Sequence, residues 1–315
     1  MKGSSSLFKF LILGAAILSM DSVKAQRNTF DQILDGEVLR LQGLRSETSG
    51  DKYAPAACKS RYKKMYGDKY ISVSIGFGYG DSDDGSVALD SMIYDAFVRK
   101  LTRPCPVDVS ACGFLRDKKD PSLFQRIVFD PTGEVNYLVS LRITKPSLSW
   151  NGKDNTTVNH ARQLQSCMAA RDKFMGEVAR GTDMAFYIGH SRDGGGPDFC
   201  PAIRLPNNHV NYPLYQRRKQ GINDLTKAMS DAVKAGKPNQ IVGSFSCSSQ
   251  KHFEARLRAA NPKAGYFLTS RTVSFGDIAA EAYTSLDSVL HQRCADGFND
   301  VFEFRKFGTN LVNMF

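Results

Sequence analysis

An alternation of short apolar runs with helical patterns between residues 135 and 293 constrains the fold of this chain most. The runs that read as strands are Val135–Ile143, Met184–Ile188, Gln240–Phe245 and Gly265–Thr269. The segments between and after them with helical periodicity are His160–Arg180, Ile222–Ala235, Lys251–Ala260 and Asp277–Arg293. This order predicts an α/β fold with a mostly parallel, doubly wound sheet between two helical layers.

The residues before this alternation predict a smaller N-terminal region. Residues 29–46 carry one apolar stripe of an amphipathic helix, and the polar stretch 47–68 predicts a surface connection. A strand over Lys69–Gly78, a helix over Val87–Leu101 and a hairpin turn at Asp130–Gly133 follow. We therefore expect an N-terminal helical and hairpin extension over 26–130 and an α/β domain over 131–315, whose main sheet begins near residue 135.

The first 25 residues have the pattern of a cleavable secretory signal. Lys2 and Lys9 precede an apolar stretch from Phe10 to Met20, which is too short to cross a bilayer. No later segment approaches the roughly 18 apolar residues of a membrane helix. We expect an exported protein, periplasmic or extracellular, with no transmembrane segment in the mature chain.

Charge and cysteine content agree with that expectation. The formal charge of +10 falls to +8 when the first 25 residues are removed. The basic residues are scattered and do not alternate with aromatic ones, so specific nucleic-acid binding is not expected, whereas an anionic envelope polymer is a candidate partner. An oxidising compartment favours disulfides among six of the seven cysteines, and only Cys105 and Cys112 are close enough in sequence to suggest a pair.

The seventh cysteine, Cys247, follows a strand-like run, as does His190. Parallel strands place their carboxyl ends at one edge of the sheet, where ligands bind, and neighbouring strand ends lie about 5–10 Å apart. A base or an imidazolium beside a thiol makes it a nucleophile. The sequence therefore predicts Cys247 as nucleophile and His190 as acid/base, with the backbone amides of Ser191 and Cys247 as oxyanion donors.

This arrangement resembles the caspase-like cysteine peptidases, the group that contains caspases, legumains, gingipains and clostripain. In that group a strand ends in histidine and glycine, and the next strand of the pattern ends in a small residue and cysteine. This chain has Gly189-His190-Ser191 and Ser246-Cys247, so serine replaces the usual glycine after the histidine. The resemblance covers about residues 135–293 and implies a peptide or protein substrate and no cofactor.

The resemblance also implies a substrate pocket wall over Thr269–Asp277, which includes Ser270 and Arg271. Asp277 would there favour a basic substrate side chain, but its position after Gly276 is also typical of a helix cap. The loop that contains Asp193, Gly194, Gly195 and Gly196 would approach the substrate. Asp193 and Asp198 are candidates to orient His190, although loop aspartates beside glycines commonly serve turns.

Other motifs indicate no further chemistry. The acidic run Gly80–Gly85 lacks the final glutamate of a calcium loop and predicts a polar turn. His209, His252 and His291 show no metal-ligand spacing, so no metal is expected.

Three functional hypotheses remain open on the sequence. The first is an exported cysteine-dependent hydrolase, a peptidase with a Cys247–His190 dyad. The second is a noncatalytic envelope or surface binding protein with a caspase-like or degenerate α/β fold. The third is a basic adhesin for anionic polymers, whose affinity would fall steeply with salt.

Overall fold

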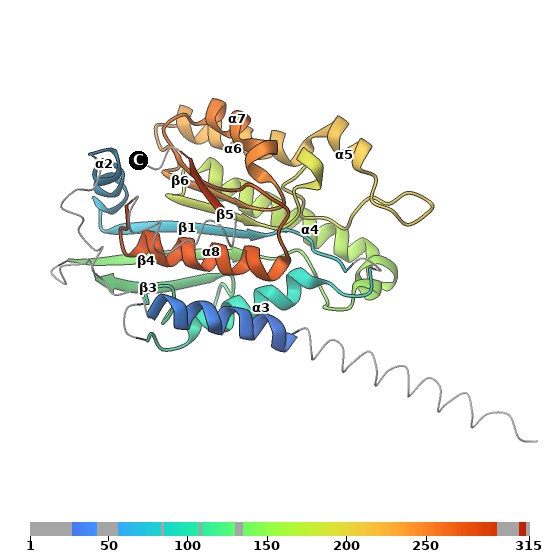
Figure 1. The fold of residues 1–315 in the computed structure, drawn as a ribbon, viewed down its shortest axis with the longest axis horizontal. Coiled ribbons are helices and arrows are strands. Elements are labelled where there is room, and N and C mark those ends of the chain that lie inside the picture. Colours follow the sequence, from blue (N-terminus) through green and yellow to red (C-terminus); the bar gives the residue numbers. More distant parts are fainter. Residues whose placement is uncertain are drawn as a thin grey trace, which may run out of the picture.

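The computed structural model describes residues 27–42, 56–82, 85–106, 109–129, 135–294 and 309–312. The predicted signal over 1–25 and the predicted turn at 130–133 lie outside these residues. The strands are β1 (Tyr70–Phe77), β2 (Leu115–Arg116), β3 (Leu123–Phe129), β4 (Asn136–Thr144), β5 (Met184–Ile188), β6 (Ile241–Phe245), β7 (Gly265–Thr269) and β8 (Thr309–Val312). They form one sheet in the order β2-β3-β4-β1-β5-β6-β7-β8 (Figure 1).

The sheet is parallel in its centre and antiparallel at both edges. Strands β4, β1, β5, β6 and β7 are parallel, whereas β2, β3 and β8 each run against a neighbour. The predicted hairpin is confirmed as β3 and β4, in the register Leu123↔Arg142 to Phe129↔Asn136. The molecule is therefore α/β with a mixed, mostly parallel sheet.

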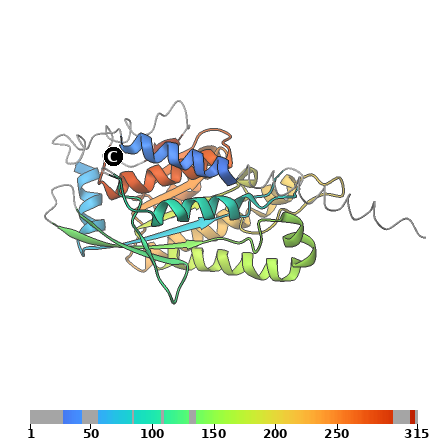
Figure 2. The same cartoon turned by 90° about the horizontal axis from the view of Figure 1, so that it is seen from below.

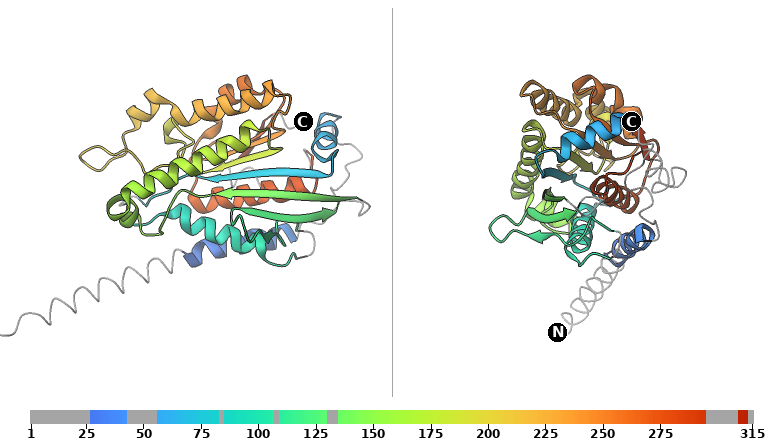
Figure 3. Two further views of the ribbon diagram at one scale, coloured as in Figure 1. Left: turned by 180° about the vertical axis from the view of Figure 1, so that it is seen from behind. Right: turned by 90° about the vertical axis from the view of Figure 1, so that its left-hand side faces the viewer.

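Helices cover both faces of this sheet (Figures 2 and 3). The helices are a first helix over 27–42, α2 (Ala56–Tyr66), α3 (Leu89–Thr102), α4 (His160–Ala179), α5 (Tyr212–Arg218), α6 (Gln220–Lys234), α7 (Ser249–Ala260) and α8 (Phe275–Leu290). The 27–42 helix, α3 and α8 lie on one face, and α4, α6 and α7 lie on the other (Figure 2). Every helix predicted from periodicity is present, with ends that differ by a few residues.

The prediction that the main sheet begins near residue 135 was wrong. Strand β1 lies between β4 and β5 in the middle of the sheet, and seven of its eight residues are at least partly buried. Its alternating pattern correctly predicted a strand but could not show which strands flank it. The sheet therefore runs across the predicted boundary between 26–130 and 131–315.

The polar stretch 47–68 was predicted as a surface connection, but its described part contains the helix α2. Tyr62 and Tyr66 are buried and donate hydrogen bonds to the carbonyls of Arg293 and Val289, at the end of α8. The Tyr66 ring also packs edge-on against Tyr137 of β4, with centroids 4.6 Å apart. A few large apolar side chains thus anchor α2, although most of its residues are polar.

Three disulfides link the six cysteines that were expected to pair: Cys58–Cys294, Cys105–Cys112 and Cys167–Cys200. The predicted local pair is confirmed, and Cys247 is the free thiol among the described residues. Three bridges are consistent with an oxidising compartment. Among the described helices, none is long and apolar enough to span a bilayer.

Candidate active site

Cys247 lies at the sharp connection between β6 and α7. Ser248 has a left-handed backbone, with φ 50°, and its amide donates to the carbonyl of Arg271 at 2.8 Å. The Ser249 hydroxyl donates back to the carbonyl of Ser244 in β6 at 2.6 Å. These bonds fix the turn that presents the partly exposed thiol, whose Sγ lies 3.6 Å from the carbonyl oxygen of Val273.

His190 occupies the matching position after β5. The amide of Gly189 donates to the carbonyl of Phe245 at 3.1 Å, which ties the end of β5 to the end of β6. The imidazole packs edge-on against the ring of Phe275, with centroids 4.8 Å apart, and 28 % of its side chain is exposed. His190 is therefore held by apolar packing on one side and open on another.

The thiol and the imidazole line the same cleft. Strands β5 and β6 are parallel neighbours, with Ile188 opposite Phe245, so Cys247 and His190 follow at one edge of the sheet. The cleft has a volume of about 430 Å³ and is mainly polar. Its lining residues are His190, Ser191, Arg192, Asp193, Tyr212, Cys247, Ser248, Lys251, His252 and Thr272.

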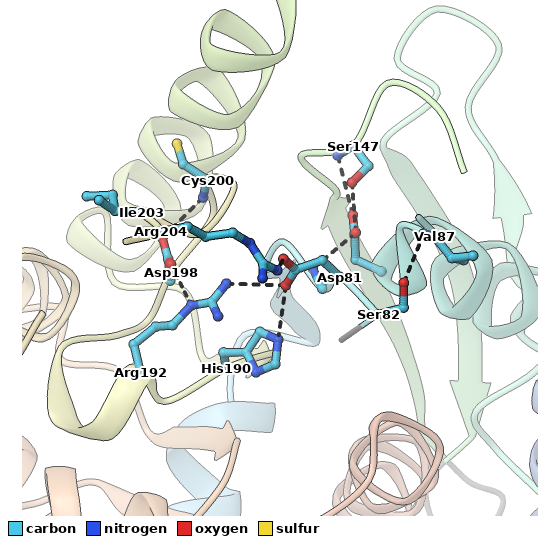
Figure 4. A network of polar contacts seen from close by, with 12 residues as sticks. Asp81, Ser82, Val87, Ser147, His190, Arg192, Asp198, Cys200, Ile203 and Arg204 are labelled. Carbon is cyan, nitrogen blue, oxygen red and sulfur yellow. Dashed lines mark hydrogen bonds and ion pairs between the residues drawn. The ribbon is translucent and has the colours of Figure 1, made fainter. Parts of the chain in front are cut away.

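Behind His190, Asp81 is the centre of a charged network (Figure 4). Its carboxylate lies 3.7 Å from His190 Nε2 and 3.7 Å from Arg192 Nη2, and it pairs closely with Arg204. Asp81 follows β1, which is the strand beside β5, so the network lies where the chain order of the parallel strands reverses. Open α/β sheets bind ligands at such points.

This environment holds His190 neutral. Burial lowers its pKa most, the cations of Arg192 and Arg204 lower it further, and Asp81 opposes them only in part. The resulting pKa is about 3, against an ordinary value of 6.5. The imidazole is therefore neutral at physiological pH and can accept a proton, although a pKa this low makes it a weaker base than an ordinary histidine.

The loop after His190 contains two strained residues. Arg192 and Asp193 have positive φ values of 46° and 51°, which are uncommon for residues with a Cβ. Arg192 is buried and pairs with Asp198 at 2.9 Å, while Asp193 lies 3.5 Å from His252 Nε2. Among the described residues, no ion pair joins Asp193 or Asp198 to His190, and the carboxylate that faces this imidazole is Asp81.

The glycines of this loop allow close packing of the chain on itself. A Cβ at Gly195 would lie 2.7 Å from Tyr215, and one at Gly196 would lie 2.6 Å from the carbonyl oxygen of His190. Gly194 has φ +91° and sits beside the ring of His252. Their role in approaching a substrate stays a prediction.

Part of the expected pocket wall over 269–277 meets the cleft, but not through the residues named from the sequence. Thr269 is buried and hydrogen-bonded to Ser249. Ser270 and Arg271 are exposed, and neither lines the cleft. Thr272 lines it instead.

Asp277 has a local structural role. Ser274 caps α8 by accepting from the Asp277 amide at 3.2 Å, and its hydroxyl donates to the Asp277 carboxylate at 2.8 Å. The cap of α8 is therefore Ser274, three residues before the position expected from the sequence, and Asp277 is the third residue of the helix, in its first turn.

The amides expected to act as oxyanion donors are available. Within the described part of the chain, neither the Ser191 amide nor the Cys247 amide donates a hydrogen bond. The Ser191 carbonyl accepts from the amides of Gly194 and Gly196, at 3.1 and 2.8 Å, which fixes the peptide chain around it. Both donors are therefore free to bind a ligand oxygen.

A separate serine–histidine–aspartate alignment occurs at the end of α8. His291 Nε2 lies 3.3 Å from the Ser110 hydroxyl, and Nδ1 lies 3.2 Å from the Asp287 carboxylate. Asp287 also accepts from the amides of Ser110 and Ala111, at 2.6 and 3.0 Å. Because both amides are occupied, they cannot stabilise an oxyanion, and the cluster fastens the 109–111 turn to α8.

Sequence reasoning missed Asp81, Arg204 and His252. Asp81 was read as part of a polar turn, because nothing in the local sequence shows that β1 pairs with β5. Within the described residues, no group of three or more histidine, cysteine, aspartate or glutamate side chains is arranged to hold a metal. Comparison with protein-family models, curated proteins and solved structures found no match.

Proposed function

We propose that this chain is an exported cysteine-dependent hydrolase, most simply a peptidase, with Cys247 as nucleophile and His190 as acid/base. The observation that carries the proposal is the shared cleft, which contains a free thiol and a neutral imidazole at the carboxyl edge of two adjacent parallel strands. Positive φ values at Arg192, Asp193 and Ser248, on both sides of this cleft, add support, because backbone strain concentrates at functional sites.

Acylation would begin with transfer of the Cys247 proton to His190. With its Nε2 proton directed toward Asp81, the imidazole would leave Nδ1 to accept that proton. The sulfur would attack the substrate carbonyl, forming a carbon–sulfur bond, and the Ser191 and Cys247 amides would stabilise the oxyanion. His190 would then protonate the leaving amine as the carbon–nitrogen bond breaks.

Deacylation would use the same groups in reverse. Neutral His190 would remove a proton from water, and the resulting hydroxide would attack the thioester carbonyl. The carbon–sulfur bond would break, the acid product would leave, and the proton would return to Cys247. No external oxidant, reductant or cofactor enters this sequence of steps.

The caspase-like relationship is part of the proposal. Its support is the order in which β5 ends in His190, the helices α5 and α6 cross over, and the adjacent strand β6 ends in Cys247. The parallel strands β4-β1-β5-β6-β7 with helices on both faces are compatible with that group.

The test combines peptide turnover with thiol labelling of the mature, non-reduced protein. A mixed peptide library analysed by mass spectrometry should show cleavage that Cys247→Ala abolishes and His190→Ala reduces by about 10²-fold or more. Iodoacetamide should label Cys247, because it is the free thiol. His209→Ala serves as the matched control, since His209 is exposed and does not line the cleft.

Cleavage retained by Cys247→Ala would exclude the proposal. If the wild-type protein does not cut the library, the noncatalytic binding protein becomes the better account. Circular dichroism of each variant separates loss of activity from loss of fold.

A further inference from the structure

An exposed apolar patch lies away from the cleft, on strands β1, β2, β3 and β4. Leu115 is 78 % exposed, Ile127 59 % and Phe129 60 %. Leu138 and Tyr70 are also among the exposed large apolar residues. Single exposed apolar residues are common, but a contiguous group marks an interaction site more often than chance.

Strand register places these five side chains on one face of the sheet. Ile127 lies opposite Leu138, Leu138 lies beside Tyr70, and Leu115 lies opposite Gln125. Gln125, Ile127 and Phe129 share a face because side chains alternate along a strand. Leu115, Ile127 and Leu138 also line one shallow groove of about 570 Å³.

No described helix covers this end of the hairpin. Helix α4 crosses at the other end, where Glu177 pairs with Arg142 at 2.9 Å and Lys173 donates to Ser122. The Ile127–Leu138 pair lies four residues along the hairpin from the Leu123–Arg142 pair, which is a distance of about 14 Å. The left view of Figure 3 shows β3 and β4 extending past α4.

Lysines border the apolar patch. Lys118 and Lys119 line the same groove, and both are exposed. Among the described residues, no carboxylate forms an ion pair with either ammonium group. The nearby Asp117 uses its carboxylate to accept the amides of Lys119 and Asp120, at 2.7 and 2.8 Å.

We propose that this patch, defined as Leu115, Ile127, Phe129, Leu138 and Tyr70 with Lys118 and Lys119, docks the protein on an anionic lipid surface. The apolar side chains enter the boundary between headgroups and acyl chains, and the lysines contact the lipid phosphates. A second copy of the chain fits less well, because it would bring the same lysines of a basic protein together.

The experiment is co-sedimentation of the mature, disulfide-bonded protein with vesicles. Binding to phosphatidylglycerol/phosphatidylcholine vesicles should exceed binding to pure phosphatidylcholine and should weaken as salt rises. Lys118→Glu with Lys119→Glu should weaken it by at least about tenfold. Ile127→Thr with Phe129→Thr, which puts a β-branched residue suited to a strand at both positions, should weaken it similarly.

The matched charge control is Lys237→Glu with Lys263→Glu. Both lysines are exposed and lie near the starts of β6 and β7, several strands away from the patch. The apolar control is Val158→Thr, at an 82 % exposed position near the start of α4. Neither control should change vesicle binding by more than about twofold.

Absence of binding to anionic vesicles would overturn the proposal. A second result would also overturn it: equal loss of binding in Lys118→Glu/Lys119→Glu and in the control Lys237→Glu/Lys263→Glu, with no loss in Ile127→Thr/Phe129→Thr. That result would indicate adsorption by net charge, as on an anionic polymer. The proposal would also be overturned if sedimentation velocity without vesicles showed a dimer that dissociates in Ile127→Thr/Phe129→Thr. The patch would then bind a second copy of the chain.

Discussion

At the scale of single residues, the environment of His190 decides which chemistry the cleft can support. Burial and the guanidinium groups of Arg192 and Arg204 hold its pKa near 3, while Asp81 faces Nε2 at 3.7 Å. The imidazole is therefore neutral before substrate binds, and it is not the cationic partner of a resting thiolate. A peptidase built this way would activate its thiol during attack.

The lowered pKa also makes the fold sensitive to acid. The unfolded chain binds a proton at His190 below about pH 6.5, whereas the native state does so only near pH 3. The free energy of unfolding should therefore fall as pH drops from about 6.5 toward 3, by up to about 1.4 kcal/mol per pH unit from this residue. His190→Gln should remove that contribution.

Urea unfolding of the wild type and His190→Gln at several pH values checks this prediction. The difference between the two proteins should grow as pH falls, because other acidic groups affect both equally. His209→Gln, at an exposed position, should follow the wild type. Parallel curves for wild type and His190→Gln would show that His190 titrates normally in the fold.

At the scale of elements, a ladder of ion pairs fastens the 27–42 helix to α3. Arg99 pairs with Asp31 at 2.7 Å, and Lys100 pairs with Asp35 and lies 3.9 Å from Asp31. Only 1 % of the Lys100 side chain is exposed, whereas Asp35 is 48 % exposed. The buried ammonium of Lys100 therefore needs an ion-pair partner, whereas the carboxylate of Asp35 is also solvated by water.

This asymmetry predicts an unusual mutational result. Asp35→Ala should destabilise the fold by about 1–2 kcal/mol, because it leaves a buried ammonium with a weaker partner. Lys100→Met should cost less, since Met fills the apolar site and Asp35 can turn to water. Adding Lys100→Met to Asp35→Ala should restore stability in urea unfolding. Additive losses in the double variant would contradict this account.

The sequence predicted the helices and strands better than it predicted which of them lie side by side in the fold. Apolar periodicity located the parallel strands and their helices, because a helix buries one apolar face and a central strand buries a continuous apolar run. It did not find α2, where tyrosines anchor a mostly polar helix, or the central place of β1. Strand order depends on contacts between distant segments, so the sequence could place Cys247 and His190 after two strands but could not place Asp81 beside His190.

At the scale of the whole molecule, the bridges differ in the length of chain they close. Cys58–Cys294 spans 236 residues and Cys105–Cys112 spans 7. Because the entropy removed from the unfolded chain grows with loop length, Cys58→Ala/Cys294→Ala should cost about 2–3 kcal/mol more than Cys105→Ala/Cys112→Ala. Urea unfolding compares them, and equal losses would indicate that native contacts, not loop closure, dominate.

The Cys58–Cys294 bridge also affects what a cut in the backbone would do. It joins α2 to the segment just after α8, so nearly every strand and helix lies between its two ends. A single nick anywhere in that span would leave both fragments covalently attached. A processed form of this protein would migrate as one species on a non-reducing gel and separate into two pieces only after reduction.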